Sequence, residues 1–263
     1  MEDHPLLARG RTAEIRQWQD GRIVKWFAPW VDAGEAAHEI RATRLAMDAG
    51  LPVPHVYEDR ILDGRAAIVF EKVTGETMLR RIQIAPWNAF SLAIEMGRLH
   101  RRLYAVPAGG LPSMKAGLAA SFSRAVQRGL SDWAVPLLLQ RLNALPDGDR
   151  LLHGDYHPDN LILSPRGMLV LDWMTARSGP PAADVARTVL LLTIGGLPGD
   201  GPAPAWVWLA RRILLWGYLR GLGSQKPDYR AWMGVIAAAR LVENIPGERA
   251  ALQHLIDTSI GSR

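Results

Sequence analysis

The sequence predicts an α+β fold, in which a small antiparallel sheet with one helix precedes a larger, mainly helical part. Two Asp-Gly pairs, at residues 20–21 and 63–64, each lie between apolar runs, a pattern that is typical of β-hairpins. After residue 87, most apolar residues recur at helical spacing instead. A polar stretch at residues 153–160 lies between two apolar runs, which predicts a loop between two strands.

Composition narrows the class of protein. The chain has 263 residues, of which 48% are hydrophobic, so we expect a globular protein. It has no cysteine, which excludes disulfides and thiolate chemistry. Residues 1–5 show no basic region followed by an apolar core, so no signal peptide is expected and we expect a cytoplasmic protein.

Charge and hydropathy argue against two kinds of partner. The net charge is +5, but the basic residues are scattered and form no run, so we do not expect a nucleic-acid partner. The most apolar stretches are interrupted by residues such as Arg211 and Pro198, so we expect no membrane span. The sequence does not predict an oligomeric state.

The N-terminal part is read as two hairpins around one helix. Residues 12–18 and 23–27 form the first pair of strands, joined by a turn at 19–22. A helix is expected at 32–49, because Gly50 and Pro52 end the pattern. The second hairpin pairs residues 53–62 with 65–70.

The later part is read as helices, with a loop at 195–204. Trp87–Tyr104 carries an apolar stripe at helical spacing. The remaining predicted helices are two within 116–145, broken near 129–131, and three more at 205–222, 229–244 and 248–256.

The chemistry is concentrated in the polar loop and the hairpin after it. A turn at 164–167 should return the chain, so that Asn160 and Asp172 face one site. An amide oxygen and a carboxylate suit Mg²⁺, which takes few protein ligands and leaves positions for phosphate oxygens. Asp155 then remains to accept a proton from a hydroxyl nucleophile. The simpler alternative is a polar loop with a capping Asp and a turn Asn.

Three features together resemble a known family: His-Gly-Asp at 153–155, Asn160, and Asp-Trp-Met at 172–174. They look like the catalytic loop and metal-binding aspartate of the aminoglycoside phosphotransferase family, within the choline-kinase-like and protein-kinase-like folds. The resemblance is strongest at residues 150–190 and weak beyond about residue 195.

The resemblance implies a two-lobed, protein-kinase-like fold. An N-terminal nucleotide-binding lobe would occupy residues 1–73, with a small antiparallel sheet and one helix. A larger, mainly helical lobe at 74–263 would hold the catalytic loop and the acceptor.

Nucleotide-binding residues follow from the same resemblance. Lys25 would contact the α- and β-phosphates, held by Glu39, with Glu35 as the alternative partner. A loop over the phosphates and a hinge against the adenine would complete the set, although the loop has one glycine where protein kinases have several. The residues expected there are Gly10, Thr12, Glu71 and Val73.

Two further residues are implied as supports of the catalytic loop. His153 would bond across the loop, and an acid–base role is the alternative. Asp184 would brace the loop through backbone N–H groups, although an acid at a helix N-terminus is also favoured by the helix dipole alone.

The resemblance implies transfer of the γ-phosphate of ATP or GTP, with Mg²⁺, to a hydroxyl of a small molecule, such as an antibiotic or an amino-alcohol. The alternatives are an inactive nucleotide-binding regulatory protein and a protein kinase. Residues 180–263 contain six acids and nine basic residues, which argues mildly against a polycationic acceptor. Fold resemblance does not choose among the acceptors.

Overall fold

The computed structural model describes residues 4–19, 21–196 and 204–261. The chain divides into two compact units. Unit 1 comprises Met1–Arg81 and Pro158–Ala176, and unit 2 comprises Ile82–His157 and Arg177–Arg263. The predicted boundary at residue 73 stays a prediction. Three expectations fall wholly or partly outside the described residues: Asp20 of the first turn, most of the loop at 195–204, and the start of the chain.

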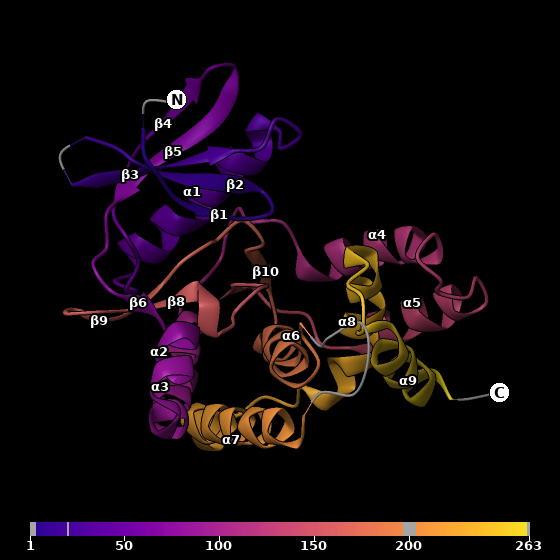
Figure 1. Ribbon diagram of the computed structural model, residues 1–263. Coiled ribbons are helices and arrows are strands. Elements are labelled where there is room, and N and C mark those ends of the chain that lie inside the picture. Colours follow the sequence, from indigo (N-terminus) through magenta and orange to yellow (C-terminus); the bar gives the residue numbers. More distant parts are fainter. Residues whose placement is uncertain (1–3, 20, 197–203, 262–263) are drawn as a thin grey trace. The chain divides into compact units, whose positions relative to one another are not determined.

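Unit 1 is built on a five-stranded antiparallel sheet with the order β1-β2-β3-β5-β4. Helix α1 (Ala33–Asp48) packs on one face of this sheet through apolar residues such as Ile40, Phe27 and Ile68 (Figure 1). Asp32 caps the helix, because its side chain accepts the N–H of Glu35. The strands are β1 (Leu6–Arg9), β2 (Ala13–Gln17), β3 (Arg22–Phe27), β4 (Val56–Leu62) and β5 (Arg65–Glu71).

A second sheet in unit 1 carries the predicted metal-site hairpin. Its order is β6-β8-β9, all antiparallel, so a strand near residue 76 pairs with one near residue 162. The N–H of Val170 donates to the carbonyl of Pro52 at 2.8 Å, which ties this hairpin to the N-terminal part of unit 1. The strands are β6 (Glu76–Thr77), β8 (Leu161–Ser164) and β9 (Gly167–Val170).

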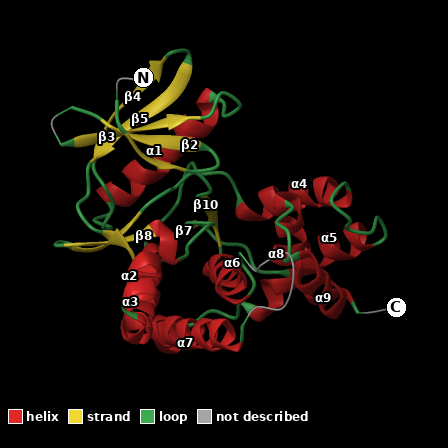
Figure 2. Cartoon of the chain, in the orientation of Figure 1, coloured by secondary structure: helices red, strands yellow, loops and turns green. Residues whose placement is uncertain are grey.

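The described residues of unit 2 are mainly helical, apart from one short antiparallel pair of strands, β7 (Arg150–Leu152) and β10 (Arg177–Gly179) (Figure 2). Its core gathers residues of α4, α5, α6, α8 and α9 around Phe122, Leu138 and Trp232. The helices after α1 are α2 (Met78–Ile84, where the units divide), α3 (Ala89–Leu103), α4 (Met114–Val126), α5 (Ala134–Ala144), α6 (Pro181–Thr193), α7 (Ala205–Leu222), α8 (Met233–Arg240) and α9 (Arg249–Ile260).

Helices α3 and α7 lie side by side with their backbones in contact (Figure 1). A Cβ added to Gly97 of α3 would overlap the carbonyl oxygen of Tyr218, and one added to Gly221 of α7 would overlap that of Ile94. Gly217, one turn earlier, is almost as tight against Ala93. Only glycine permits this approach, and it places the two helices where Tyr218 and His100 meet.

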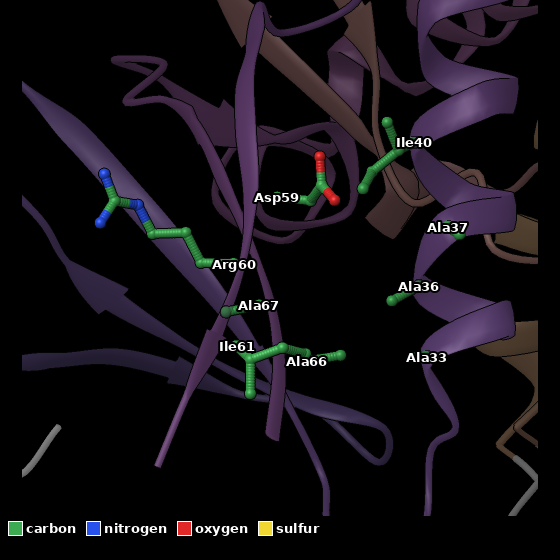
Figure 3. A pocket seen from close by; sticks show the side chains of 9 residues that line it. All are labelled: Ala33, Ala36, Ala37, Ile40, Asp59, Arg60, Ile61, Ala66 and Ala67. Carbon is green, nitrogen blue, oxygen red and sulfur yellow. The ribbon is translucent and has the colours of Figure 1, made fainter. Parts of the chain in front are cut away.

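A pocket of about 200 Å³ lies in unit 1 between α1 and strands β4 and β5. Three alanines of α1 leave the space, and Figure 3 shows Asp59 and Ile40 pointing toward each other across it while Arg60 points away. None of the residues predicted for the active site lines this pocket.

The structure confirms the predicted fold class, with an antiparallel sheet and one helix first and a helical part after it. Strand β1 and helix α2 were not predicted. The expected helix at 229–244 is a regular α-helix only at Met233–Arg240, with one 3₁₀ turn on each side. Within the described part of the chain, no helix is long and apolar enough to span a bilayer.

Candidate active site

Lys25 is held between two carboxylates in unit 1. It lies on β3, and its Nζ donates to both carboxylate oxygens of Glu39 at 2.8 Å. The same Nζ donates to Oδ1 of Asp172 at 2.9 Å. Glu39 is 1% exposed on helix α1, whereas Glu35 is exposed. The predicted pair of Lys25 with Glu39 is therefore present, and Glu35 is not the partner.

These partners set the charge of Lys25. Burial by itself lowers the pKa of an ammonium group, but the charges and hydrogen bonds of Glu39 and Asp172 raise the pKa of Lys25 well above its ordinary value. Burial raises the pKa of Glu39, and the nearby Asp172 raises it further, against the lowering effect of Lys25. Lys25 is thus a fixed cation, suited to an anionic ligand.

Asn160 and Asp172 are brought to neighbouring positions by the β8–β9 hairpin. The N–H of Leu171 donates to the carbonyl of Asn160 at 2.9 Å. The backbone hydrogen bonds between β8 and β9 therefore continue to the residue before Asp172. Asp172 has a φ of 60°, a left-handed conformation that is uncommon outside glycine and that often marks functional sites.

This pair of donors fits a magnesium ion. One amide oxygen and one carboxylate are hard ligands, and Mg²⁺ is commonly held by one or two carboxylates with water and phosphate oxygens. Across residues 4–19, 21–196 and 204–261, no group of three or more His, Cys, Asp and Glu side chains could hold a metal ion. A metal that needs a cage of such side chains is therefore not matched by the described residues.

The predicted loop and hinge residues lie at strand ends of unit 1. Gly10 and Thr12 lie between β1 and β2, where the N–H of Gly10 donates to the carbonyl of Ala13 at 2.9 Å. Glu71 ends β5, and its carboxylate accepts from Arg166 at 2.7 Å. Val73 follows in the irregular segment before β6. Their nucleotide contacts stay predictions.

In unit 2, Asp184 supports the loop that carries Asp155. Asp184 is fully buried near the start of α6, and its two oxygens accept the N–H groups of His153 at 2.7 Å and Gly154 at 2.8 Å. Gly154 has a φ of 78°, which is a conformation that glycine adopts without strain. The predicted bracing of the loop by Asp184 is present.

His153 has the geometry of a structural residue. Its side chain is buried, and its Nδ1 accepts the N–H of Asp155 at 3.2 Å. The ring therefore bonds across the loop, as the prediction of a supporting role requires. A ring nitrogen that accepts a backbone N–H holds no proton there to donate.

A buried chain of side chains behind Asp184 was missed by sequence reasoning. Nε2 of His100 lies 2.9 Å from Oδ2 of Asp184, and Nδ1 lies 2.7 Å from the hydroxyl of Tyr218. Because the carboxylate only accepts, Nε2 donates to it, and the other ring nitrogen is hydrogen-bonded to the hydroxyl of Tyr218. The available signal was a histidine at the edge of the apolar stripe of α3.

Asp155 itself faces a histidine and an arginine. Its Oδ2 lies 3.3 Å from Nε2 of His157, and its Oδ1 lies 3.5 Å from Nη2 of Arg187. Burial alone would raise the pKa of Asp155, but the hydrogen bond from His157 and the charge of Arg187 lower it well below its ordinary range. Asp155 is therefore ionised at neutral pH and able to accept a proton or a hydrogen bond.

The candidate residues thus form two sets, each built within one unit. Lys25, Glu39, Asn160 and Asp172 belong to unit 1, and Asp155 with its supports belongs to unit 2. The chain passes from one unit to the other between residues 157 and 158, so Asp155 and Asn160 are close in sequence although they belong to different units.

Solved structures of low sequence identity share the protein-kinase-like fold. An amicoumacin kinase, solved with AMP-PNP, Ca²⁺ and Ami, is 15% identical, with a TM-score of 0.61 over 98% of this chain and 88% of that one. An aminoglycoside-3'-phosphotransferase of type VIII is 22% identical, with a TM-score of 0.60 over 91% and 90%. A choline kinase from Cryptosporidium parvum is 10% identical, with a TM-score of 0.62 over 98% and 91%.

A human protein named acyl-CoA dehydrogenase family member 11 is 23% identical over 238 residues, which cover 77% of this chain. The matched part is only 30% of the human protein, so this chain corresponds to less than a third of that relative. The model of the phosphotransferase enzyme family, called APH, matches residues 8–205. That match covers most of the described chain, including both sets of candidate residues, and the protein belongs to this phosphotransferase family.

Proposed function

We propose that this protein transfers the γ-phosphate of ATP or GTP to a hydroxyl group of a small molecule, in the cytoplasm. The observation that carries the proposal is the arrangement around Lys25, a buried cation bonded at once to Glu39 and Asp172. A buried lysine held in this way is ready to neutralise phosphate charge, which is a recurring part of phosphoryl transfer.

Each residue has a role in the proposed reaction. Lys25, held by Glu39, contacts the α- and β-phosphates, while Asn160 and Asp172 hold Mg²⁺. The metal would neutralise charge on the phosphate oxygens when bound. Asp155 orients the acceptor hydroxyl and takes its proton, on a loop that Asp184 braces. Gly10, Thr12, Glu71 and Val73 are proposed contacts of the nucleotide.

The acceptor is the least constrained part of the proposal. The similar structures include kinases of amicoumacin, aminoglycosides and choline. In unit 2, however, three of the acids after residue 180 are committed to partners inside the protein: Asp184 to His100, and Glu243 and Glu248 to Arg240. Fewer carboxylates then remain for a polycation, which favours an acceptor with little positive charge.

An inactive nucleotide-binding protein is the weaker alternative. A degraded kinase would lack at least one catalytic side chain, whereas Lys25, Asp155, Asn160 and Asp172 are all present. A protein kinase is weaker too, because its His-Arg-Asp and Asp-Phe-Gly signatures are replaced here.

An ADP-release or GDP-release assay with Mg-ATP and Mg-GTP tests the proposal. The acceptor panel contains aminoglycosides, macrolides, tuberactinomycin-type peptides, choline, thiamine and homoserine. An acyl-CoA thioester is added to the panel, because the human relative is named as an acyl-CoA dehydrogenase family member. Transfer to one acceptor, seen as its phosphorylated mass, supports the proposal. If calorimetry detects no Mg-nucleotide binding, the kinase assignment fails.

We expect Asp172→Ala to weaken binding of Mg-ATP by about 10- to 100-fold. Loss of a residue that only hydrogen-bonds to a metal ligand already weakens metal binding by about that factor. The carboxylate is a proposed metal ligand and also a partner of Lys25. Calorimetry with Mg²⁺ and with EDTA checks this. The difference in nucleotide Kd between Asp172→Ala and the wild type should shrink in EDTA. An equal difference in both buffers would contradict metal binding by Asp172.

The pH dependence of the rate should show no acid limb from Asp155. Its pKa is depressed, so the carboxylate loses its proton far below neutrality and stays ionised as pH rises. We therefore expect kcat/KM to be free of an Asp155 ionisation between about pH 5 and about pH 8. A limb in that range that is absent in Asp155→Asn would contradict the assignment of a depressed pKa.

A further inference from the structure

Arg187 contacts both the side chain and the backbone of the loop that carries Asp155. Its Nη2 lies 3.5 Å from Oδ1 of Asp155, and its Nε donates to the carbonyl of Gly154 at 3.2 Å. The side chain is only 13% exposed. Arg187 therefore holds the carboxylate and the peptide group directly before it.

Arg187 and Asp184 are both on α6, three residues apart, and residues at this spacing share one face of a helix. Asp184 accepts the N–H groups of His153 and Gly154, while Arg187 donates to the carbonyl of Gly154. One turn of α6 thus satisfies donors and acceptors of the same short loop. Arg187 also reaches the side chain of Asp155.

A second arginine fixes the position of Arg187 indirectly. Glu243 accepts from Nη2 of Arg187 at 2.5 Å and from Nη1 of Arg240 at 2.5 Å. Arg240 in turn donates to both oxygens of Glu248, at 2.8 and 3.0 Å, and Glu248 accepts the N–H of Gly196. The ion pair of Arg240 with Glu248 is buried, because their side chains are 6% and 0% exposed.

The charges in this chain support one another. Burial would raise the pKa of Glu243, but the guanidinium groups of Arg187 and Arg240 lower it below its ordinary value. Glu243 is therefore a carboxylate at neutral pH. Glu243 is held by Arg240 and in turn binds the guanidinium of Arg187. Arg187 is therefore fixed in position before any acceptor binds.

We propose that Arg187 is a positioning residue for Asp155 and that Glu243 holds Arg187 in place. This inference rests on the proposed function, because it assigns Asp155 the acceptor hydroxyl. His157 contacts one carboxylate oxygen and Arg187 the other, so the plane of the carboxylate is fixed from two sides. The Arg187 contact, at 3.5 Å, is an ion pair and is long for a hydrogen bond.

The test compares Arg187→Met, which keeps length but loses charge, with Arg187→Lys and Glu243→Gln. We expect Arg187→Met to lower kcat by about 10- to 100-fold, because a misplacement of about 1 Å costs about 100-fold. KM and the Kd for Mg-ATP should stay within about twofold, because binding shared by ground and transition states is retained. Arg187→Lys should restore part of kcat, and Glu243→Gln should lower kcat less than Arg187→Met.

The exposed Arg212 gives a matched control, since Arg212→Met removes a charge from unit 2 without touching the loop. Unchanged kcat in Arg187→Met would overturn the proposal. A loss of kcat that Arg187→Lys does not relieve, with a rise in the Kd for Mg-ATP, would mean a purely structural role and would overturn it too.

Failure of the proposed function is seen separately, as a wild type that binds no Mg-nucleotide. The contact is then judged by urea unfolding of Arg187→Met, Asp155→Asn and the double variant. Changes in the free energy of unfolding that do not add in the double variant would support an interaction between the two side chains. Additive effects would overturn the positioning proposal, whatever reaction the protein performs.

Discussion

Asp155→Ala is expected to lower kcat by about 1,000-fold, within the range for loss of a positioned general base. Such a loss corresponds to about 4 kcal/mol of transition-state stabilisation. Asp155 is ionised, its two oxygens face His157 and Arg187, and its backbone N–H is tied to His153. No phosphate or metal contact is assigned to it, so the Kd for Mg-ATP should be retained.

Steady-state kinetics with the acceptor found in the panel and calorimetry with Mg-ATP check this prediction. Asp155→Asn keeps the shape of the side chain and should be nearly as slow, since it cannot take a proton. Asp147→Asn, at an exposed acid eight residues earlier, is the control and should turn over normally. Wild-type turnover by Asp155→Ala would remove Asp155 from the chemistry.

Asp184→Ala should lower the free energy of unfolding by about 3–5 kcal/mol, the usual cost of removing one partner from a buried charged contact. The carboxylate is fully buried and accepts from His153, Gly154 and His100. Without it, the backbone N–H groups of His153 and Gly154 and the buried imidazole of His100 lose their acceptor. Urea unfolding at neutral pH measures the effect.

The pH dependence of that effect has a defined sign. Burial favours the neutral acid, but His100 and the loop hydrogen bonds lower the folded-state pKa of Asp184 below its ordinary 3.8. Its stabilisation is therefore complete above that value and is lost as pH falls through the folded-state pKa. The difference between wild type and Asp184→Ala should narrow only in strong acid.

The exposed Asp132 supplies the control for stability. Asp132→Ala should change the free energy of unfolding by no more than about 0.5 kcal/mol, as surface substitutions usually do. An equally small effect of Asp184→Ala would show that the buried contacts contribute little.

Short sequence patterns predicted the elements whose structure depends on neighbouring residues, such as tight turns and long helices. The second hairpin was found from its Asp-Gly turn, where Asp63 and Gly64 both have positive φ, as a tight hairpin requires. Strand β1 was missed because its residues are exposed and show no alternation. Helix α2 was missed because seven residues are too few for a clear period.

The same distinction holds for the candidate site. Asp155, Asn160 and Asp172 lie close in sequence, and their spacing was enough to mark them. Arg187 and Glu243 contact each other across 56 residues. A contact of that separation depends on how whole helices pack, so no pattern in one sequence predicted it.

The glycine contact between α3 and α7 has a consequence for how such enzymes diverge. Ordinary helix contacts adjust during evolution by trading side-chain volume, a larger residue on one helix for a smaller one on its neighbour. At Gly97, Gly217 and Gly221 there is no volume left to trade. Trp206, Trp208 and Trp216 of α7 are exposed instead. We therefore expect any side chain added at these glycines to push the two helices apart and to separate Tyr218 from His100.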